Sequence, residues 1–205
     1  MPAKPLPRHI GFIPDGNRRW AAGRGLPKEA GYAFGLAPGL ALFEACRGLA
    51  IEEVSVYGFT QDNTRRPGAQ TERFRAACVE FALEIARRGA ALLVVGDERS
   101  PQFPAALKPL RQRTAGDIKV NFLVNYGWEW DLEGLREDGR LRSADVSRLD
   151  LVVRWGGGRR LSGFLPVQSV YADFHVVDAF WPDFEMDQFH AALAWFAQQD
   201  RTLGG

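Results

Sequence analysis

Short apolar runs alternate along the chain with segments of helical spacing. The runs are rich in Val, Ile, Leu and Phe and are nearly continuous, which is typical of strands that are buried on both faces. They are His9–Pro14, Glu53–Phe59, Leu92–Asp97, Val120–Tyr126, Leu149–Arg154 and Phe174–Phe180. Amphipathic segments are found at Gly31–Ala50, Ala69–Arg88, Phe103–Thr114, Trp128–Glu137 and Met186–Gln199. The alternation predicts an α/β fold in which helices cover both faces of a parallel sheet.

Length and composition place this fold in one domain. The 205 residues contain no repeat, low-complexity tract or linker, so we expect a single domain over residues 1–205, with residues 1–8 flexible. The polar stretch Arg136–Arg148 predicts a loop or a frayed helix. A net charge of +1 gives the whole chain no attraction for nucleic acid, so an anion would have to be bound by a local cluster.

The sequence shows no signal-peptide pattern and uses few cysteines, which predicts a cytoplasmic protein. The first residues lack the apolar stretch of a signal peptide, and no run approaches the roughly 18 apolar residues of a membrane span. The two cysteines, Cys46 and Cys78, lie in apolar helical stretches and have no CxxC spacing. We therefore expect them to be buried free thiols in a reducing compartment.

Basic and polar residues collect directly after the predicted strands. In an open parallel sheet, ligands bind beyond the carboxyl ends of the strands. The segments after the first, second, fourth and fifth runs read DGNRRW, TQDNTRRP, NYGWEW and RWGGGRRLS. Since arginine, asparagine and glycine dominate these ends, the sequence predicts one basic site at this edge of the sheet.

The segment RWGGGRRLS is the clearest candidate for anion binding. Its three consecutive glycines allow backbone amides to approach a ligand closely. Arg154, Arg159 and Arg160 supply forked donors that match phosphate oxygens, and Ser162 adds a hydroxyl group. The alternative is a flexible glycine turn between solvated arginines. Neither a GxxxxGK[ST] loop nor a GxGxxG turn opening a helix is present.

Asp15, in DGNRRW, is the candidate metal ligand. The three histidines have no ligand spacing, so a histidine-based zinc site is not expected. A Mg²⁺ ion would rest on one or two carboxylates together with substrate phosphates. Alternatively, Asp15 caps the turn after its strand or neutralises the neighbouring arginines. The residues thus indicate a diphosphate-bearing ligand with Mg²⁺, and leave open phosphoryl transfer, diphosphate loss and simple binding.

In combination, these motifs resemble those of the cis-prenyltransferases, the family of the undecaprenyl diphosphate synthases. HIGFIPDGNRRWA resembles the first signature of the family, and RWGGGRRLSGFLPVQSVYADF with VVDAFWPDF resembles its C-terminal signature. VYGFTQDNTRRP, VVGD, VNYG and the terminal DRTLGG follow the family order, so the resemblance runs from about His9 to Gly205. It implies a six-stranded, mainly parallel sheet with flanking helices, an apolar tunnel and a homodimer.

The resemblance implies Mg²⁺-dependent prenyl transfer. An allylic diphosphate would be joined to isopentenyl diphosphate with a cis double bond, and the protein would contact a membrane only peripherally, through its product. One alternative is an irregular terpene synthase of the same fold that couples two allylic diphosphates. The other is a non-catalytic partner subunit of a heteromeric enzyme, which the presence of Asp15 argues against.

Roles for individual residues also follow from the resemblance. Asp15 would anchor Mg²⁺ and help the allylic diphosphate to leave, and Asn63 and Arg66 would complete the catalytic set. Asp173 stands where the family has a glutamate associated with Mg²⁺. The implied substrate-binding residues are Gly16, Asn17, Arg18, Arg19, Trp20, Lys28, Tyr32, Thr60, Arg154, Arg160 and Ser162.

Several departures from the family pattern indicate a divergent member. They are Arg18 and Trp128 in place of glycines, Tyr32 in place of a histidine, Thr64 in place of a tryptophan, and Gly158 in place of a glutamate. The stretch between Tyr126 and Arg154 is also shorter than in the family, which weakens the inference of a homodimer. We expect Phe122 and Leu123 to plug the tunnel floor and to favour a short product.

Overall fold

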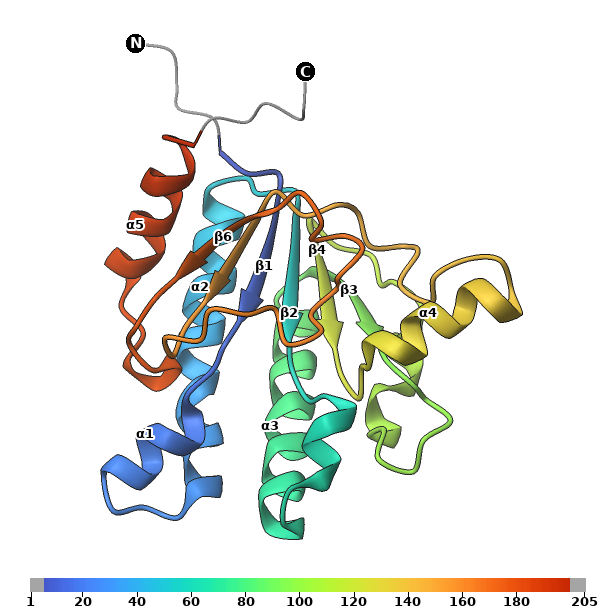
Figure 1. Ribbon diagram of the computed structural model, residues 1–205, viewed down its shortest axis with the longest axis horizontal. Coiled ribbons are helices and arrows are strands. Elements are labelled where there is room, and N and C mark those ends of the chain that lie inside the picture. The colour runs from blue at the N-terminus through green and yellow to red at the C-terminus, as the bar shows by residue number, and fades with distance from the viewer. Residues whose placement is uncertain (1–5, 200–205) are drawn as a thin grey trace.

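Six strands form one sheet in the order β3-β4-β2-β1-β5-β6 (Figure 1). The computed structural model describes residues 6–199. The strands are β1 (His9–Ile13), β2 (Glu53–Tyr57), β3 (Ala90–Val95), β4 (Ile118–Leu123), β5 (Leu151–Arg154) and β6 (Asp173–Val176). All five pairings are parallel, so the strands end at one common edge, the lower edge in Figure 1. The predicted α/β fold with a six-stranded parallel sheet is confirmed.

Two of the five predicted helical segments differ from the observed ones in helix type. The α-helices are α1 (Asn17–Gly23), α2 (Leu36–Gly48), α3 (Gly68–Arg87), α4 (Trp128–Glu137) and α5 (Met186–Phe196), and the 3₁₀ segments are η1 (Lys28–Gly35), η2 (Gln61–Arg65), η3 (Ala105–Arg111) and η4 (Trp181–Asp183). The helix predicted over Gly31–Ala50 therefore begins as a 3₁₀ segment. The helix predicted over Phe103–Thr114 is only η3, since Pro109 within it cannot donate an α-helical hydrogen bond. No helix within residues 6–199 is long and apolar enough to span a bilayer.

The two faces of the sheet are covered by different layers. Helices α2, α3 and α5 pack on one face, over a cluster that includes Phe12, Val54 and Phe122. The other face is covered by α4 and by the irregular segment 161–172, which crosses in front of the strands in Figure 1. Because side chains alternate along a strand, Leu123 belongs to this second cluster. Leu123 thus lies on the face opposite Phe122, and the prediction that both plug one tunnel is wrong for Leu123.

Residues 1–5 and the terminal DRTLGG motif lie outside the described residues, but Arg8, near the start of the chain, is held in place. Its backbone N–H donates to Asp150 Oδ2 at 2.7 Å, and its guanidinium pairs with Glu52 at 2.8 Å. Cys46 and Cys78 are buried free thiols, as predicted, and burial raises the pKa of Cys78 to about 12.

Candidate active site

A cleft of about 660 Å³ opens at the carboxyl edge of the sheet, where β1, β2 and β5 end. Its walls come from the β1–α1 turn, η1, η2 and the loop after β5. Thirteen of the residues that the sequence singled out line it, namely Asp15, Gly16, Asn17, Arg18, Arg19, Lys28, Tyr32, Thr60, Asn63, Arg66, Arg154, Arg160 and Ser162. Segments that are far apart in the sequence thus meet here, as the rule for parallel sheets predicts.

The charge of the cleft is strongly positive. Its lining carries two carboxylates, Asp15 and Asp62, against six cationic side chains, which are Arg18, Arg19, Lys28, Arg66, Arg154 and Arg160. A concave wall with one dominant sign of charge concentrates ligands of the opposite sign. The cleft is therefore built for an anion, and its cations suffice for more than one phosphate group.

Asp15 connects the β1–α1 turn to the loop after β5. Its Oδ2 accepts a hydrogen bond from Arg154 Nη2 at 2.7 Å and lies 3.3 Å from Arg19 Nη2, while Oδ1 accepts from the Gly16 N–H at 2.6 Å. Burial acts to raise the pKa of Asp15, but the two guanidinium groups outweigh it and hold the pKa below its usual value. Asp15 is thus ionised at neutral pH, both paired with arginines and open to the cleft.

The buried side chain of Arg154 holds the glycine-rich loop in place through hydrogen bonds. Its side chain is only 4% exposed, and its Nη1 donates to the Arg160 carbonyl and to Ser162 Oγ, the latter at 2.9 Å. Gly158 allows the close approach that this requires, because a Cβ there would lie 2.6 Å from Arg154 Nε. One buried guanidinium therefore ties Asp15 to both ends of the motif that begins at Arg154.

The turn η2 presents Asn63 and Arg66. Thr60 and Asn63 form a reciprocal capping pair, in which Asn63 N–H donates to Thr60 Oγ1 at 3.3 Å and Thr60 N–H donates to Asn63 Oδ1 at 3.2 Å. Arg66 Nη1 donates to the Tyr32 hydroxyl at 2.9 Å. The Tyr32 ring stacks on Phe74, with centroids 4.5 Å apart. This turn is therefore locked locally and also anchored to η1 and α3.

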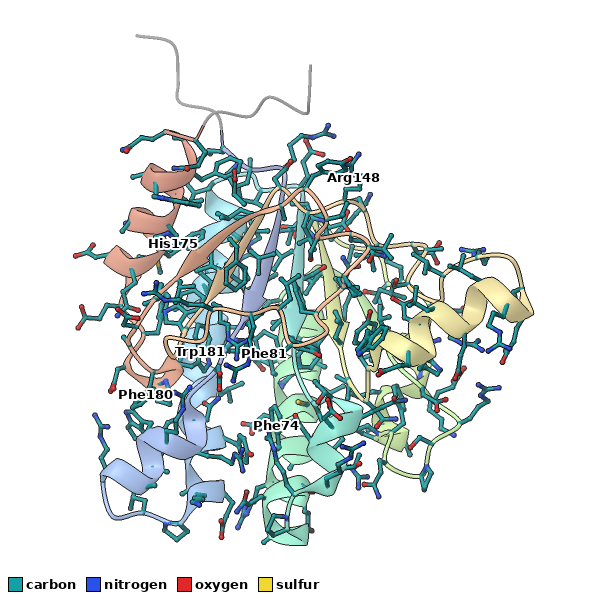
Figure 2. The ribbon with its side chains drawn as sticks, in the orientation of Figure 1. Phe74, Phe81, Arg148, His175, Phe180 and Trp181 are labelled. Atoms are coloured by element: carbon teal, nitrogen blue, oxygen red, sulfur yellow. The ribbon has the colours of Figure 1, made fainter. Side chains whose placement is uncertain are left out.

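A small apolar cavity of about 70 Å³ lies next to the cleft and shares Asn17, Tyr32, Tyr57 and Phe74 with its lining. Gly39, Phe81, Phe122 and Trp181 are among its other lining residues. Figure 2 shows Phe74, Phe81 and Trp181 grouped where α3 meets the lower half of the sheet. The rings of Phe81 and Phe122 meet edge to face, with centroids 5.2 Å apart. The implied apolar tunnel is thus a short pocket with aromatic walls.

Two of the expected site residues lie elsewhere. Trp20 is on the buried face of α1, where its Nε1 donates to Asp183 Oδ1 at 2.7 Å and its ring packs on Phe34. It is not among the residues that line the cleft.

Asp173 is the other of these two residues. It begins β6 at the amino edge of the sheet, in register with Leu151. In Figure 2, His175 of the same strand already lies well above Phe180 and Trp181. Asp15, by contrast, follows the carboxyl end of β1. Within one chain, Asp15 and Asp173 therefore do not share a metal site.

The cleft residues that the sequence analysis did not single out include Tyr57, Gly58, Asp62 and Phe74. Tyr57 and Gly58 end the second apolar run, so the carboxyl-end rule could have found them. Asp62 lies inside a motif that was already noted. Phe74 is on α3, and nothing local in the sequence separates it from an ordinary core residue.

The residues present fit a Mg²⁺ ion that is held in part by substrate. Within residues 6–199, no three His, Cys, Asp or Glu side chains are grouped so that they could hold a metal ion by themselves. Asp15 is 36% exposed and faces a cationic cleft suited to phosphate oxygens. One carboxylate with substrate phosphates is a common arrangement for Mg²⁺, so Asp15 is the residue that would hold it.

Comparison with known proteins gives consistent matches over the whole chain. The family model described as undecaprenyl diphosphate synthase matches residues 13–204. A ditrans,polycis-undecaprenyl-diphosphate synthase, (2E,6E)-farnesyl-diphosphate specific, from Pseudomonas syringae pv. tomato is 32% identical over 97% of this chain and 91% of its own length. An isoprenyl transferase from Zymomonas mobilis is 31% identical over 98% of this chain and 92% of its own.

A solved structure has the same fold. Lavandulyl diphosphate synthase from Lavandula x intermedia, in complex with dimethylallyl diphosphate, superposes with a TM-score of 0.82 at 22% identity. The match covers 98% of this chain and 99% of the other. At this identity the likeness concerns the fold alone.

Proposed function

This chain belongs to the undecaprenyl diphosphate synthase family of prenyltransferases, and we propose that it condenses an allylic diphosphate with isopentenyl diphosphate into a cis-prenyl diphosphate. One observation supports this most strongly. A single cleft combines cationic groups from the β1–α1 turn and from the loop after β5, and an apolar pocket adjoins it. Two diphosphates and one hydrocarbon chain need this combination of surfaces.

The two sides of the cleft would take different diphosphates. Arg19 and the turn Gly16–Arg18 would hold the allylic diphosphate, with its hydrocarbon directed into the apolar pocket. Arg160 and Ser162 would hold the diphosphate of isopentenyl diphosphate, and buried Arg154 would keep them in place. Lys28 extends the cationic wall at the rim of the cleft.

The proposed reaction breaks the C1–O bond of the allylic substrate, forms a carbon–carbon bond to the terminal carbon of isopentenyl diphosphate, and releases a proton. Charge moves onto the leaving diphosphate, and the arginines around it stabilise that charge in a fixed geometry. Bound Mg²⁺, held by Asp15, would add further neutralisation of the same oxygens. Asn63 and Arg66 would orient the reacting groups from the η2 turn.

We further propose that the product is short, because the apolar pocket is small and the rings of Phe81 and Phe122 meet in its lining. Replacing Phe122 by alanine is expected to open the pocket and shift the product distribution by at least one isoprene unit. Liquid chromatography with mass spectrometry of the products, at equal conversion, measures the shift.

Leu123→Ala is the matched control for Phe122→Ala. Leu123 is fully buried in the same strand, but on the opposite face of the sheet. Both variants should lose stability through the cavity they create, by roughly 2–5 kcal/mol. Only Phe122→Ala should lengthen the product, and identical product lengths in both variants would contradict a stop at Phe122.

A homodimer is a further proposal, and we place its interface at the open edge of the sheet. β6 is one of the two outer strands of the sheet, and Val167, Val170 and Tyr171, just before it, are exposed. Exposed apolar side chains beside an unpaired strand edge favour association. Light scattering coupled to size exclusion should find a dimer, and Val170→Asp should shift it towards monomer. A monomeric wild-type protein at assay concentration would contradict this interface.

A cytoplasmic location, with peripheral membrane contact through the product, stays a prediction. Its basis is the apolar hydrocarbon that the product carries and the absence of a spanning helix within residues 6–199. Flotation of the purified protein with vesicles, before and after turnover, would test the membrane contact. Co-flotation that depends on turnover supports a role of the product.

The proposed function is tested by measuring diphosphate release with different substrate pairs. The purified protein receives Mg²⁺ with an allylic diphosphate alone, with isopentenyl diphosphate alone, or with both. Release only with both substrates supports condensation of the proposed kind. Release from the allylic diphosphate alone, with a coupled product, indicates irregular coupling, and no release under any condition indicates a non-catalytic subunit.

A further inference from the structure

The junction between β4 and α4 lies between the turn η2 and the loop after β5, which carries Ser162. On one side, Thr60 pairs with Tyr126 as an isolated parallel bridge, and the Gln61 N–H donates to the Tyr126 carbonyl at 2.9 Å. Gly127 is packed so closely against the Gln61 side chain that a Cβ there would collide with it. The turn η2 is therefore docked directly on the residue before α4.

On its other side, the junction contacts the loop after β5 through Trp128. A Cβ on Gly163 would lie 2.8 Å from Trp128 Cδ1, so the indole covers the backbone of Gly163. Trp128 is still 44% exposed and does not line the cleft. A large aromatic side chain at the start of α4 is thus partly buried against a glycine of the loop after β5.

The covered loop has an unusual backbone. Ser162 has φ +52° and Leu165 has φ +38°, which are uncommon for residues that carry a side chain, and Gly163 between them has φ +78°. Such conformations persist where the surroundings fix them. Here the Tyr57 hydroxyl donates to the Ser162 carbonyl at 2.8 Å, and Arg154 Nη1 donates to Ser162 Oγ at 2.9 Å.

We propose that Trp128 and Tyr57 are positioning residues for the second diphosphate. Trp128 packs on Gly163 and Tyr57 holds the Ser162 carbonyl, so that Arg160 and Ser162 face the cleft in a fixed register with Asn63 on η2. The inference rests on the proposed function only in identifying isopentenyl diphosphate as the ligand. Trp128 and Tyr57 together form a clamp on the loop after β5.

The test measures binding of isopentenyl diphosphate by calorimetry, in the absence of an allylic substrate. Trp128→Gly is expected to weaken this binding about tenfold, because the loop loses its cover and samples other conformations. Trp128→Phe should restore most of the affinity, and Tyr57→Phe should weaken binding in the same direction. Affinity for a non-reactive allylic thiolodiphosphate should change less than about twofold in every variant.

Leu135→Gly is the matched control for Trp128→Gly. Leu135 is on the same helix and 49% exposed, so its loss weakens α4 without touching the loop after β5. Unchanged binding in Trp128→Gly, or equal losses in Trp128→Gly and Leu135→Gly, would overturn the proposal. If wild-type protein binds isopentenyl diphosphate but forms no product, the proposed function fails. The clamp is then still tested by comparing the affinities of the wild type and the variants for isopentenyl diphosphate. If wild-type protein does not bind isopentenyl diphosphate at all, both fail.

Discussion

Asp15→Asn is expected to lower kcat by about 10³-fold while the protein stays folded. The substitution removes the carboxylate that would hold Mg²⁺ and replaces it with a neutral group of nearly the same shape. The asparagine oxygen can still accept from either Gly16 or Arg154, so the β1–α1 turn keeps part of its hydrogen bonding. Turnover at saturating substrates and Mg²⁺, together with a thermal melt, measures both effects. A kcat within tenfold of the wild type would contradict the role of Asp15.

The pH dependence of stability gives this variant an internal control. The pKa of Asp15 in the folded protein is lowered from its ordinary value of 3.8. Its ion pairs therefore stabilise the wild type above that pH, and their contribution is lost as the pH falls through the lower, folded-state pKa. The difference in melting temperature between wild type and Asp15→Asn should be present at neutral pH and shrink below pH 3.8. A difference that is independent of pH would show that the charge of Asp15 does not matter to the fold.

Arg154→Lys is expected to lower kcat/KM by about 10²-fold, mostly through a raised KM for isopentenyl diphosphate. Lysine keeps the positive charge but is a single point donor. It cannot reach Asp15 on one side and the Arg160 carbonyl and Ser162 on the other, as the buried guanidinium does. The loop that carries Arg160 and Ser162 would then lose the hydrogen bonds that Arg154 donates to it.

Arg159→Lys is the matched control in the same motif. Arg159 is exposed and does not line the cleft, so the same exchange there should leave kcat/KM within about twofold of the wild type. Steady-state kinetics with each substrate varied in turn separates the two KM values. Equal effects at Arg154 and Arg159 would contradict a special role for the buried guanidinium.

The parallel pairing of the strands and the position of the cleft followed from simple rules. Apolar runs separated by helical segments predict parallel strands, and parallel strands bring their carboxyl ends together. Asp15 and Arg154, which are 139 positions apart, were expected at one edge for this reason and share a hydrogen bond there. Phe74 could not be predicted in this way, because only the packing of α3 against η1 brings it beside Tyr32.

Asp173 shows the limit of reasoning by resemblance. The run Phe174–Phe180 was predicted as a strand, so Asp173 precedes it and belongs to the amino edge of a parallel sheet. The rule that located Asp15 therefore separates Asp173 from it, and the structure agrees with the rule. Trp20 differs from its neighbours in the motif, because it is buried and donates to Asp183 while Arg18 and Arg19 line the cleft.

The most direct measurement is the structure of the first condensation product. Wild-type protein is incubated with Mg²⁺, isopentenyl diphosphate and a short allylic diphosphate, and the isolated product is analysed by mass spectrometry and NMR. We expect a diphosphate that is one isoprene unit longer than the allylic substrate, with a cis geometry at the new double bond. A trans double bond, a branched coupling of two allylic units, or no new carbon–carbon bond would contradict the proposed reaction.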